Sequence, residues 1–503
     1  MLTLLIVLLL AGAVIAWLVQ RLSTNAPRQV ALATLSIALL LLLPLLFNLN
    51  NGVLIAVQGD SWLLLERHPW IPRFGISWLL GMDGMSLLLL LLTLILGLVA
   101  IAASWTEINQ RQGFFYFNLL ACLAGVVGVF TALDLFLFFV FWEVMLIPVY
   151  FLIGIWGHEN RHYAALKFVI FTQTSSLLML ISIVGLALLH QQQNGSYSFD
   201  YFELLGSGSH SPYGFWLMLG FFIAFVVKLP AFPLHTWLAD AHTQAPTAGS
   251  IILAGVLLKT GAYGLIRFLI PLFPDSLHSF APVGMTIGVI GIFYGALLAF
   301  AQYDLKRLVA YSSISHMGFI LLGVYAWNEL ALQGAVMQML THGFSSAALF
   351  MLAGAVQQRI HSRDMRQMGG LWSQAPRMAA IALFFAMASL GIPGLGNFIA
   401  EFLILIGSFQ ASVPATVLAT LGLVGAAIYA LIMIQRVFHG QQQSSHHLVD
   451  FDRREQVTMA VMMLALLLLG LYPQPTLDIL RPVLDQLQAL VQASSTPLVG
   501  VIL

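Results

Sequence analysis

The chain has 503 residues, of which 60% are hydrophobic and 8% are charged, and its formal net charge is zero. Because soluble domains carry about 25% charged residues, this composition predicts a polytopic membrane protein and excludes a sizeable soluble part. The balanced charge gives no sign of a nucleic-acid partner. The single cysteine, Cys122, excludes a disulfide framework and a metal site built from several thiolates.

Apolar runs of about 20 residues, long enough to cross a bilayer, predict an all-α fold with about 14 transmembrane helices. The first run, Leu2–Leu18, lacks a basic start and is expected to stay as an uncleaved helix. The predicted helices lie near residues 2–20, 29–50, 78–104, 113–131, 133–155, 163–190, 213–236, 247–270, 279–301, 306–326, 331–357, 377–409, 415–438 and 457–473. The tail Pro475–Gln492 alternates apolar and polar residues at helical spacing, which predicts an amphipathic helix at the membrane surface.

Lysine and arginine concentrate in every second connection, and this asymmetry sets the orientation of the chain. The connections after odd-numbered helices hold Arg21, Arg28, Arg111, Arg161, Lys306, Arg307, Arg359, Arg363, Arg366, Arg377, Arg436, Arg453 and Arg454. The other connections and the tail hold Arg67, Arg73 and Arg481, with Arg267 at a helix end. We therefore expect the odd connections in the cytoplasm and both termini on the opposite side.

Two predicted helices are interrupted. In the seventh, Pro230 and Pro233 cannot donate the backbone hydrogen bonds that the carbonyls of Val226 and Leu229 would accept. The twelfth is interrupted by Gly391, Pro393, Gly394 and Gly396. Paired interrupted helices are typical of transporters with ion sites near the midplane. Because proline and glycine are common in membrane helices, a purely structural origin of the breaks stays open.

The breaks occupy matching positions, each in the fourth helix of a block of five. An odd number of helices in each block makes the second block run inverted. The predicted organisation is helices 1–3 in residues 1–112, a first five-helix repeat in 113–273, a second, inverted repeat in 274–440, and a last helix with a short tail in 441–503.

Several ionisable residues fall inside apolar stretches. Lys228 lies in Phe221–Pro233, Lys259 in Ser250–Ile270 and Glu401 in Ala379–Phe409. Such a group at the bilayer centre costs roughly 2.5–3.5 kcal/mol on insertion scales. A chain that keeps several of them uses them, pairs them, or does both.

Glu143 has no neutralising residue nearby in the sequence, and Lys228 in the same block is its expected partner. The pair is either a static ion pair that fixes helix packing or a switch. In the second reading, loss of the Glu143 charge withdraws support from Lys228, which then releases its proton. Lys167 lies near a helix start, and its side chain is expected to reach the membrane surface.

Lys259 has no carboxylate in its own helix, which favours a proton relay because a buried lysine titrates readily. His316 and His342 flank one short connection and are expected at similar depth on adjacent antiparallel helices. Hydroxyl residues surround them at Ser312, Ser313, Ser315, Thr341, Ser345 and Ser346. This pattern favours a hydrated path along which histidine passes protons, and Glu401 ends the series.

Four further polar groups have weaker signals. Asp134 begins a helix and is expected to favour the positive end of its dipole, and Asp304–Arg307 is expected to anchor a helix at the cytoplasmic face. His235 and His242, on either side of Asp240, either admit protons or lie in solvent.

Three stretches resemble the antiporter-like subunits of respiratory complex I, the proton-pumping NADH:quinone oxidoreductase. They are Leu135–Pro148, Ala224–Ser250 and Asp304–Gly318. The second is long and specific to this superfamily, which also includes Mrp-type cation/proton antiporters and membrane-bound hydrogenase subunits. The chain is similar to the chain M (subunit 4) type in particular, which has glutamate where most members have lysine, here Glu401.

The resemblance implies roles for matching positions. Glu143 and Lys228 would be the coupling pair, Lys259 the central relay, His316 and His342 the connectors, and Glu401 the exit-side group. It also implies a bacterial inner membrane and partnership with the other membrane subunits, including neighbouring antiporter-like chains. No cofactor is expected on this chain, since FMN, iron–sulfur clusters and quinone would belong to partner subunits.

Two other functions compete with proton translocation in complex I. One is an Mrp-type sodium/proton antiporter, for which the broken helices leave room. The other is a haem-bearing electron carrier that uses His316 and His342, although their hydroxyl-rich surroundings disfavour it.

Overall fold

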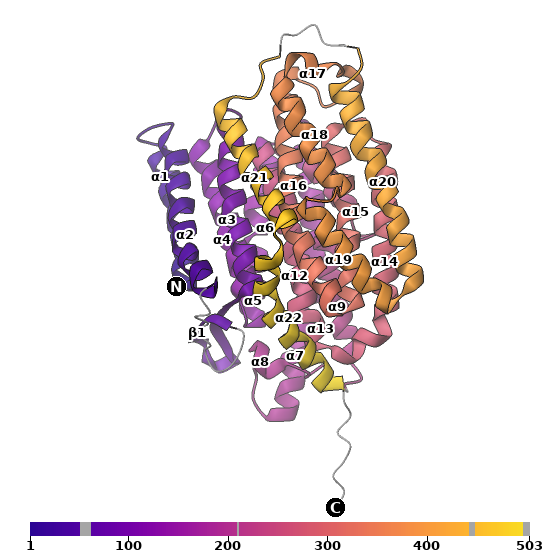
Figure 1. Cartoon of the computed structure of the whole chain (residues 1–503). Helices are drawn as coiled ribbons and strands as arrows, with labels where there is room; N and C mark the ends of the chain where they lie inside the picture. Colours follow the sequence, from indigo (N-terminus) through magenta and orange to yellow (C-terminus); the bar gives the residue numbers. More distant parts are fainter. Residues whose placement is uncertain (51–61, 209–210, 442–447, 496–503) are drawn as a thin grey trace, which may run out of the picture.

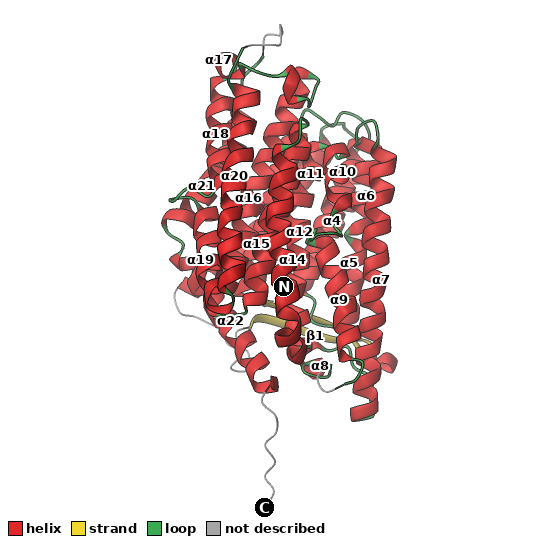
Figure 2. Ribbon diagram, turned by 90° about the vertical axis from the view of Figure 1, so that its right-hand side faces the viewer, coloured by secondary structure: helices red, strands yellow, loops and turns green. Residues whose placement is uncertain are grey.

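The computed structural model describes residues 1–50, 62–208, 211–441 and 448–495 (Figure 1). Long helices run side by side through the whole molecule, and a small pair of strands lies at one end (Figure 2). Among the described residues, twelve helices are long and apolar enough to cross a membrane. The fold is therefore that of a polytopic, almost entirely α-helical membrane protein.

The N-terminal part and the first predicted repeat contain thirteen α-helices and both strands. Their bounds are α1 Leu2–Val19, α2 Ala26–Asn50, β1 Trp62–Ile71, β2 Ile76–Asp83, α3 Gly84–Ser104, α4 Gln112–Thr131, α5 Leu135–Val144, α6 Leu146–Trp156, α7 Arg161–Asn194, α8 Tyr201–Leu204, α9 Gly214–Lys228, α10 Thr236–Gln244, α11 Thr247–Ile252, α12 Leu258–Gly264 and α13 Ile270–Leu272. Pro72–Phe74 forms a 3₁₀ turn, and Leu253–Leu257 and Leu265–Leu269 are π-helical turns.

The remaining helices follow in chain order. Their bounds are α14 Pro274–Phe300, α15 Leu305–Ala326, α16 Glu329–Ile360, α17 Leu371–Gln374, α18 Pro376–Leu390, α19 Gly396–Ala411, α20 Val413–Phe438, α21 Arg453–Leu471 and α22 Gln474–Ser495. Met365–Gln367 is a short 3₁₀ turn.

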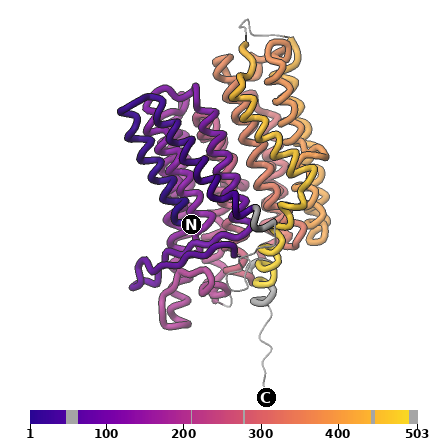
Figure 3. The backbone as a smooth tube through the Cα atoms, turned by 60° about the vertical axis from the view of Figure 1, so that its left-hand side comes forward, coloured from indigo at the N-terminus to yellow at the C-terminus, as the bar shows by residue number. Residues whose placement is uncertain are grey.

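The third helix begins later in the structure than the predicted range, 78–104, indicates. Residues up to Asp83 belong to β2, which pairs antiparallel with β1, and α3 begins only at Gly84. The Asp83 carboxylate accepts a hydrogen bond from the Ser86 backbone N–H, and this cap fixes the start of the helix. Figure 3 shows the hairpin of β1 and β2 beneath the N-terminal helices. We call this end of the bundle the hairpin side.

Two short backbone crossings of the same kind lie at opposite ends of the bundle. Near the hairpin, Leu135 N donates to Phe199 O and Tyr201 N donates to Leu133 O, at 2.8 and 2.9 Å. At the other end, Leu305 N donates to Arg363 O and Met365 N donates to Tyr303 O, at 3.0 and 2.8 Å. The first crossing ties the start of α5 to the segment after α7, and the second ties the start of α15 to the segment after α16. Figure 1 places α8 and α17, which follow the two crossings, at opposite ends.

An aspartate stands at the centre of each crossing and caps the helix that follows. Asp134 accepts from the N–H groups of Phe136 and Leu137 and also from Ser77 in the hairpin. Asp304 accepts from the Arg307 N–H. The expected dipole role of Asp134 and the anchoring role of Asp304 agree with these contacts.

The seventh predicted helix ends at the predicted break. Helix α9 stops at Lys228, and α10 resumes at Thr236. The carbonyl of Val226, which proline was expected to leave without a partner, accepts from Ala231 N at 2.9 Å instead. The indole N–H of Trp237 donates to Val227 O at 3.0 Å. The open turn is therefore held by replacement hydrogen bonds from the chain that follows it.

The twelfth predicted helix consists of two pieces, α18 and α19, joined at 391–395. Gly391 and Gly394 have φ values of +80° and +95°, in the left-handed region that glycine enters at little cost. Both predicted breaks are therefore present, and each leaves an irregular backbone segment inside the bundle.

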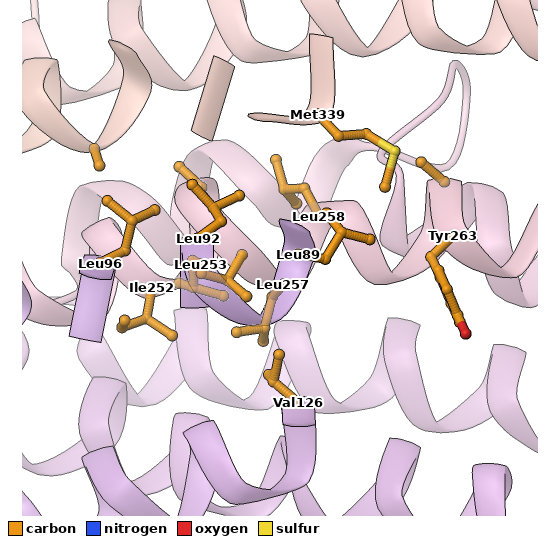
Figure 4. Close-up of a cluster of buried hydrophobic side chains, with 14 of the residues drawn as sticks. Leu89, Leu92, Leu96, Val126, Ile252, Leu253, Leu257, Leu258, Tyr263 and Met339 are labelled. Carbon is orange, nitrogen blue, oxygen red and sulfur yellow. The ribbon is translucent and has the colours of Figure 1, made fainter. Parts of the chain in front are cut away.

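The apolar core surrounds the helix that carries Lys259. Figure 4 shows leucine side chains of α3, Val126 of α4, and leucine and isoleucine side chains of the 247–264 segment packed together, with Tyr263 at the edge. Leu253, Leu257 and Leu258 are completely or almost completely buried. The most apolar stretch of Thr247–Leu272 is entirely buried in the bundle. This helix therefore has no side that faces lipid.

The amphipathic tail is helical, as predicted, and its apolar face packs on the bundle. Leu480, Leu484 and Leu487 of α22 are at most 2% exposed. A Cβ atom at Gly84 would lie 2.2 Å from the carbonyl oxygen of Ile479, so α22 rests directly on the start of α3. Figure 1 shows α22 running down to the hairpin side.

Asp134→Ala should destabilise the fold. The variant removes the hydrogen bonds that hold Ser77 and the first turn of α5, which together are expected to contribute about 1–3 kcal/mol. The midpoint of thermal unfolding of the purified complex should fall. Asp485→Ala serves as the control, because Asp485 is exposed and its ion pair with Arg481, at 3.9 Å, contributes little to stability. Equal midpoints for the two variants would contradict the proposed anchoring role.

Candidate functional site

A row of contacts joins four of the predicted site residues, which come from four different helices. Lys259 Nζ lies 2.8 Å from His342 Nδ1, and the rings of His342 and His316 are 5.4 Å apart between centroids. His316 Nδ1 lies 2.9 Å from Glu401 Oε1. All four side chains are at most 4% exposed. The sequence prediction that the two histidines lie at one depth on adjacent helices is therefore confirmed.

The backbone around Lys259 helps to place its ammonium group. The helix widens into a π-helical turn at Leu253–Leu257, and Lys259 Nζ donates to Ala254 O within this turn. A π turn shifts carbonyls out of the regular hydrogen-bond ladder and is frequent at functional sites. Lys259 thus has a carbonyl and an imidazole nitrogen as partners in place of a carboxylate.

His316 has polar partners on both ring nitrogens. The Nε2 atom lies 3.0 Å from the Tyr429 hydroxyl and 3.2 Å from Ser389 Oγ. On the other edge, Gln338 Nε2 donates to Glu401 Oε1 at 3.2 Å and approaches His316 Nδ1 at 3.3 Å. Tyr429, Ser389 and Gln338 could not be predicted from the sequence, because they come from three helices far apart in the chain.

Six hydroxyl residues were expected to surround the two histidines, but four of them donate to backbone carbonyls instead. Ser312 and Ser313 donate to Val309 O, and Ser346 donates to His342 O. Ser315 Oγ donates to Ile292 O at 2.9 Å. These bonds return to the backbone, so the hydroxyls that contact His316 are supplied by Ser389 and Tyr429 instead.

Lys228 lies in an aromatic cage. Its Nζ is 5.2 Å from the centre of the Trp142 ring and 5.7 Å from that of Phe168, distances at which a ring face attracts a cation. Lys228 is 1% exposed and is also the last residue of α9, where the helix dipole favours positive charge. The Nζ atom has no hydrogen-bond partner among the described residues.

Glu143 is partly buried on α5 and directly follows Trp142. Its Oε1 atom is buried and has no hydrogen-bond partner within the described part of the chain. No ion pair of 4 Å or less joins Glu143 to Lys228 there, so the expected partners lie near one another without touching. Glu143 stands one residue before the end of α5, where the chain bends at Met145 into α6.

The helices that carry Lys228 and Lys259 are in close backbone contact. A Cβ at Gly261 would lie 2.5 Å from Phe225 O, and a Cβ at Gly264 would meet the Phe225 ring at 2.4 Å. Glycine at these positions lets α12 approach α9. No direct polar contact between the two lysines is found among the described residues.

Three further predicted residues have defined places. His242 is completely buried against Phe350, with ring centroids 4.3 Å apart, and neither ring nitrogen has a partner among the described residues. His235 is 3% exposed, so neither histidine lies in solvent. Lys167, expected to reach the surface, pairs with Asp240 at 2.7 Å.

A basic cluster lies at the end of the bundle away from the hairpin. Lys306 Nζ donates to Ala245 O at 3.1 Å, and the Arg363 guanidinium donates to Thr243 O and pairs with Asp304 at 3.2 Å. Burial, together with the nearby Lys306 and Arg363 cations, lowers the pKa of His158 to about 4. His158, in the connection between α6 and α7, is therefore neutral at neutral pH.

Comparison with known proteins assigns the chain to a family. Residues 132–429 match the family described as NADH:quinone oxidoreductase/Mrp antiporter, TM. NADH-quinone oxidoreductase subunit M of Pseudomonas aeruginosa is 52% identical over 497 residues, which cover 97% of both chains. The Escherichia coli K12 subunit M is 50% identical over 485 residues, or 95% of both chains. The chain belongs to the NADH-quinone oxidoreductase subunit M family.

The family membership confirms the resemblance noted in the sequence. The chain is a multi-pass, proton-translocating subunit of the membrane arm of bacterial respiratory complex I, where it works with other subunits. A chain of the Thermus thermophilus complex has the same fold, with a TM-score of 0.87, 29% identity, and coverage of 99% of this chain and 100% of that one.

A chain of the Mrp complex from Dietzia sp. DQ12-45-1b also has this fold, with a TM-score of 0.83 over 98% of this chain and 99% of that one. Its identity of 21% makes it evidence for the fold alone.

Tyr429→Phe should slow coupled turnover without loss of assembly. The variant removes one hydrogen bond to His316 Nε2 and leaves Ser389 in place. A single bond of about 0.5–1.5 kcal/mol corresponds to a roughly two- to tenfold change in the rate of proton movement. The rate is measured as NADH-driven proton uptake in membrane vesicles. Tyr472→Phe, at an exposed tyrosine, is the control, and identical rates in both variants would show that Tyr429 has no part in the path.

Proposed function

We propose that protons cross this subunit along Glu143, Lys228, Lys259, His342, His316 and Glu401. The observation that carries the proposal is the contact between Lys259 and His342, followed by that between His316 and Glu401, inside a buried interior. Buried ionisable groups that follow one another through the interior of a membrane protein are typical of proton relays.

The chemistry of the central step follows from the donors and acceptors. Lys259 N–H points at His342 Nδ1, so a neutral His342 carries its own proton on Nε2. That Nε2 has no partner among the described residues and is free to donate onward. When Lys259 transfers a proton to Nδ1, His342 can release its Nε2 proton, which His316 would accept at Nε2, the nitrogen that faces the Tyr429 and Ser389 hydroxyls. His316 would then pass its Nδ1 proton to Glu401 Oε1.

The gap between Lys228 and Lys259 requires water. Their helices touch, yet no described polar side chain bridges the two ammonium groups. We infer that a transient water chain closes this gap when Lys228 is ready to donate.

Glu143 and Lys228 form the coupling switch in this proposal. Lys228 is held by two rings and a helix end, and Glu143 is close but not in contact. Movement of Glu143 at the bend of α5 and α6 would change the electrostatic support of Lys228. The energy would come from quinone reduction in partner subunits, which would also hold the FMN and iron–sulfur clusters.

We further propose two inverted five-helix repeats, in residues 113–273 and 274–440, within about 14 membrane spans. The two crossings at opposite ends support this arrangement, as does the break in the fourth span of each repeat. The pieces α9, α18 and α19 then complete the seventh and twelfth spans. The flanking parts, 1–112 and 441–503, add the N-terminal helices, the last span and the tail, of which 51–61, 442–447 and 496–503 lie outside the described residues.

The hairpin side faces the periplasm in our proposal. The basic cluster of Lys306, Arg307 and Arg363 lies at the other end, which the positive-inside rule places in the cytoplasm. Helix α1 starts near the hairpin, and α22 runs toward it (Figure 1). Exposed apolar residues on α7 and α20, such as Ile181 and Val424, would contact lipid or the neighbouring antiporter-like chains.

An Mrp-type sodium/proton antiporter is the alternative, supported by the shared fold. Vesicles distinguish the two functions. Proton uptake driven by NADH supports the complex I role, whereas exchange driven by a sodium gradient without an electron donor supports the alternative. Haem ligation by His316 and His342 finds no support, because three of their four ring nitrogens already have polar partners.

Lys228→Ala and Glu143→Ala should each abolish proton pumping and sharply reduce coupled turnover while the subunit still assembles. Glu143→Asp keeps the charge and should be milder. The measurement is the number of protons taken up per NADH oxidised. Glu203→Ala, at an exposed glutamate outside the row, provides the matched control. A normal proton yield in Lys228→Ala would rule out the switch.

Glu401→Lys tests the exit-side role. Glu401 accepts from Gln338 and faces His316 Nδ1, so a cation there would repel a protonated His316. If the exit needs only a titratable group, part of the pumping should survive at a rate reduced by tenfold or less. Glu401→Gln keeps the size and removes the charge, and pumping at the original rate in that variant would show that Glu401 carries no protons.

A further inference from the structure

A second buried polar cluster lies between the relay and the hairpin side. The Arg267 guanidinium forms an ion pair with Asp83, and both residues are at most 2% exposed. Tyr263, one turn before Arg267, places its hydroxyl 3.1 Å from Phe130 O and 3.3 Å from Ser86 Oγ. The cluster therefore connects the helix of Lys259 to the start of α3.

Three hydrogen-bond donors at the outer edge of this cluster lack partners. They are Trp62 Nε1, Tyr201 OH and Arg267 Nε, all buried, with no partner among the described residues. A buried donor without an acceptor costs about 1–3 kcal/mol. Three of them beside one another indicate a missing acceptor.

These three residues border a partly open cavity of about 140 Å³. Its wall also includes Leu205 and, from α22, Leu487. Helix α22 thus covers the cavity on one side, and the close contact between Ile479 and Gly84 seats the helix over it.

We propose that this cavity binds a cluster of ordered water molecules and gives the first repeat an aqueous connection to the hairpin side. Water is the acceptor that fits, because each molecule accepts hydrogen bonds from N–H and O–H groups and needs only about 30 Å³. The Arg267 charge is already balanced by Asp83, so an anion has no unpaired cation to bind.

The connection to the relay runs through Tyr263. Lys259 and Tyr263 are four residues apart on α12 and therefore share one face of the helix. The Tyr263 hydroxyl lies 3.3 Å from Ser86 Oγ, and the Ser86 backbone N–H donates to Asp83, the ion-pair partner of Arg267 at the cavity. Because a backbone N–H does not relay protons, water from the cavity would carry them past this point. This step rests on the proposed function, since it gives Lys259 a second route for protons. The presence of water in the cavity does not depend on it.

Cysteine labelling tests whether the cavity holds water. Leu487→Cys would place a thiol in the cavity wall, and Leu484→Cys would place one on the same helix outside it. Thiolates react, and a thiol ionises only where it meets water. The assembled complex in membrane vesicles is treated with a small, charged methanethiosulfonate from each side. The native Cys122 is fully buried, which keeps the background low.

The Leu487→Cys thiol should react at least tenfold faster than the Leu484→Cys thiol, and only from the hairpin side. Equal, slow reaction of both would overturn the proposal, because a dry cavity protects both thiols. The double substitution Tyr201→Phe with Trp62→Phe removes two of the unpaired donors. It should slow the labelling of Leu487→Cys. Unchanged labelling would show that these donors do not hold the water.

Tyr263→Phe tests the link to the relay separately. The proton yield per NADH should fall while labelling of Leu487→Cys stays fast. Tyr116→Phe, which removes another buried hydroxyl 3.4 Å from Ser104, controls for loss of packing. A normal proton yield in Tyr263→Phe would overturn the connection to Lys259. A normal yield in Lys228→Ala would instead remove the proposed function and leave the labelling result unaffected.

Discussion

The hydrogen bond between Lys259 and His342 is the interaction on which the site depends. Both groups are removed from bulk water, so each must be satisfied by a neighbour. The π turn offers a carbonyl to the ammonium, and His342 offers a nitrogen with a lone pair. Because His342 also faces His316, the same contact that relieves the burial of Lys259 joins the two halves of the chain.

The breaks and crossings explain how side chains from distant helices meet. Ending α9 at Lys228 leaves the ammonium at a helix terminus, between rings of α5 and α7. Ending α18 near Ser389 and restarting at Gly396 brings Ser389 and Glu401 to the two edges of His316. Irregular backbone is tolerated at this depth because the surrounding helices bury it and replace its lost hydrogen bonds.

The sequence predicts the spans, the breaks and the buried charges well, because hydropathy and helix-breaking residues are local signals. It also places His316 and His342 together. It does not predict the hairpin of β1 and β2, whose residues include an apolar run that reads like the start of a helix. Tyr429, Ser389 and Gln338 stay hidden, since contacts between distant helices leave no spacing in the chain. The expected contact between Glu143 and Lys228 is absent among the described residues. The rings of Trp142 and Phe168 lie around Lys228 instead, and in the sequence these residues look like ordinary core residues.

The aromatic cage around Lys228 has a consequence for how tightly proton transport is coupled to the energy that drives it. A carboxylate in direct contact could accept the lysine proton itself, and the charge would then collapse locally without any transport. Ring faces attract a cation but have no basic site, so Trp142 and Phe168 steady Lys228 without competing for its proton. With Glu143 held out of contact, it cannot take that proton directly, and in the proposed relay the proton of Lys228 would leave toward Lys259.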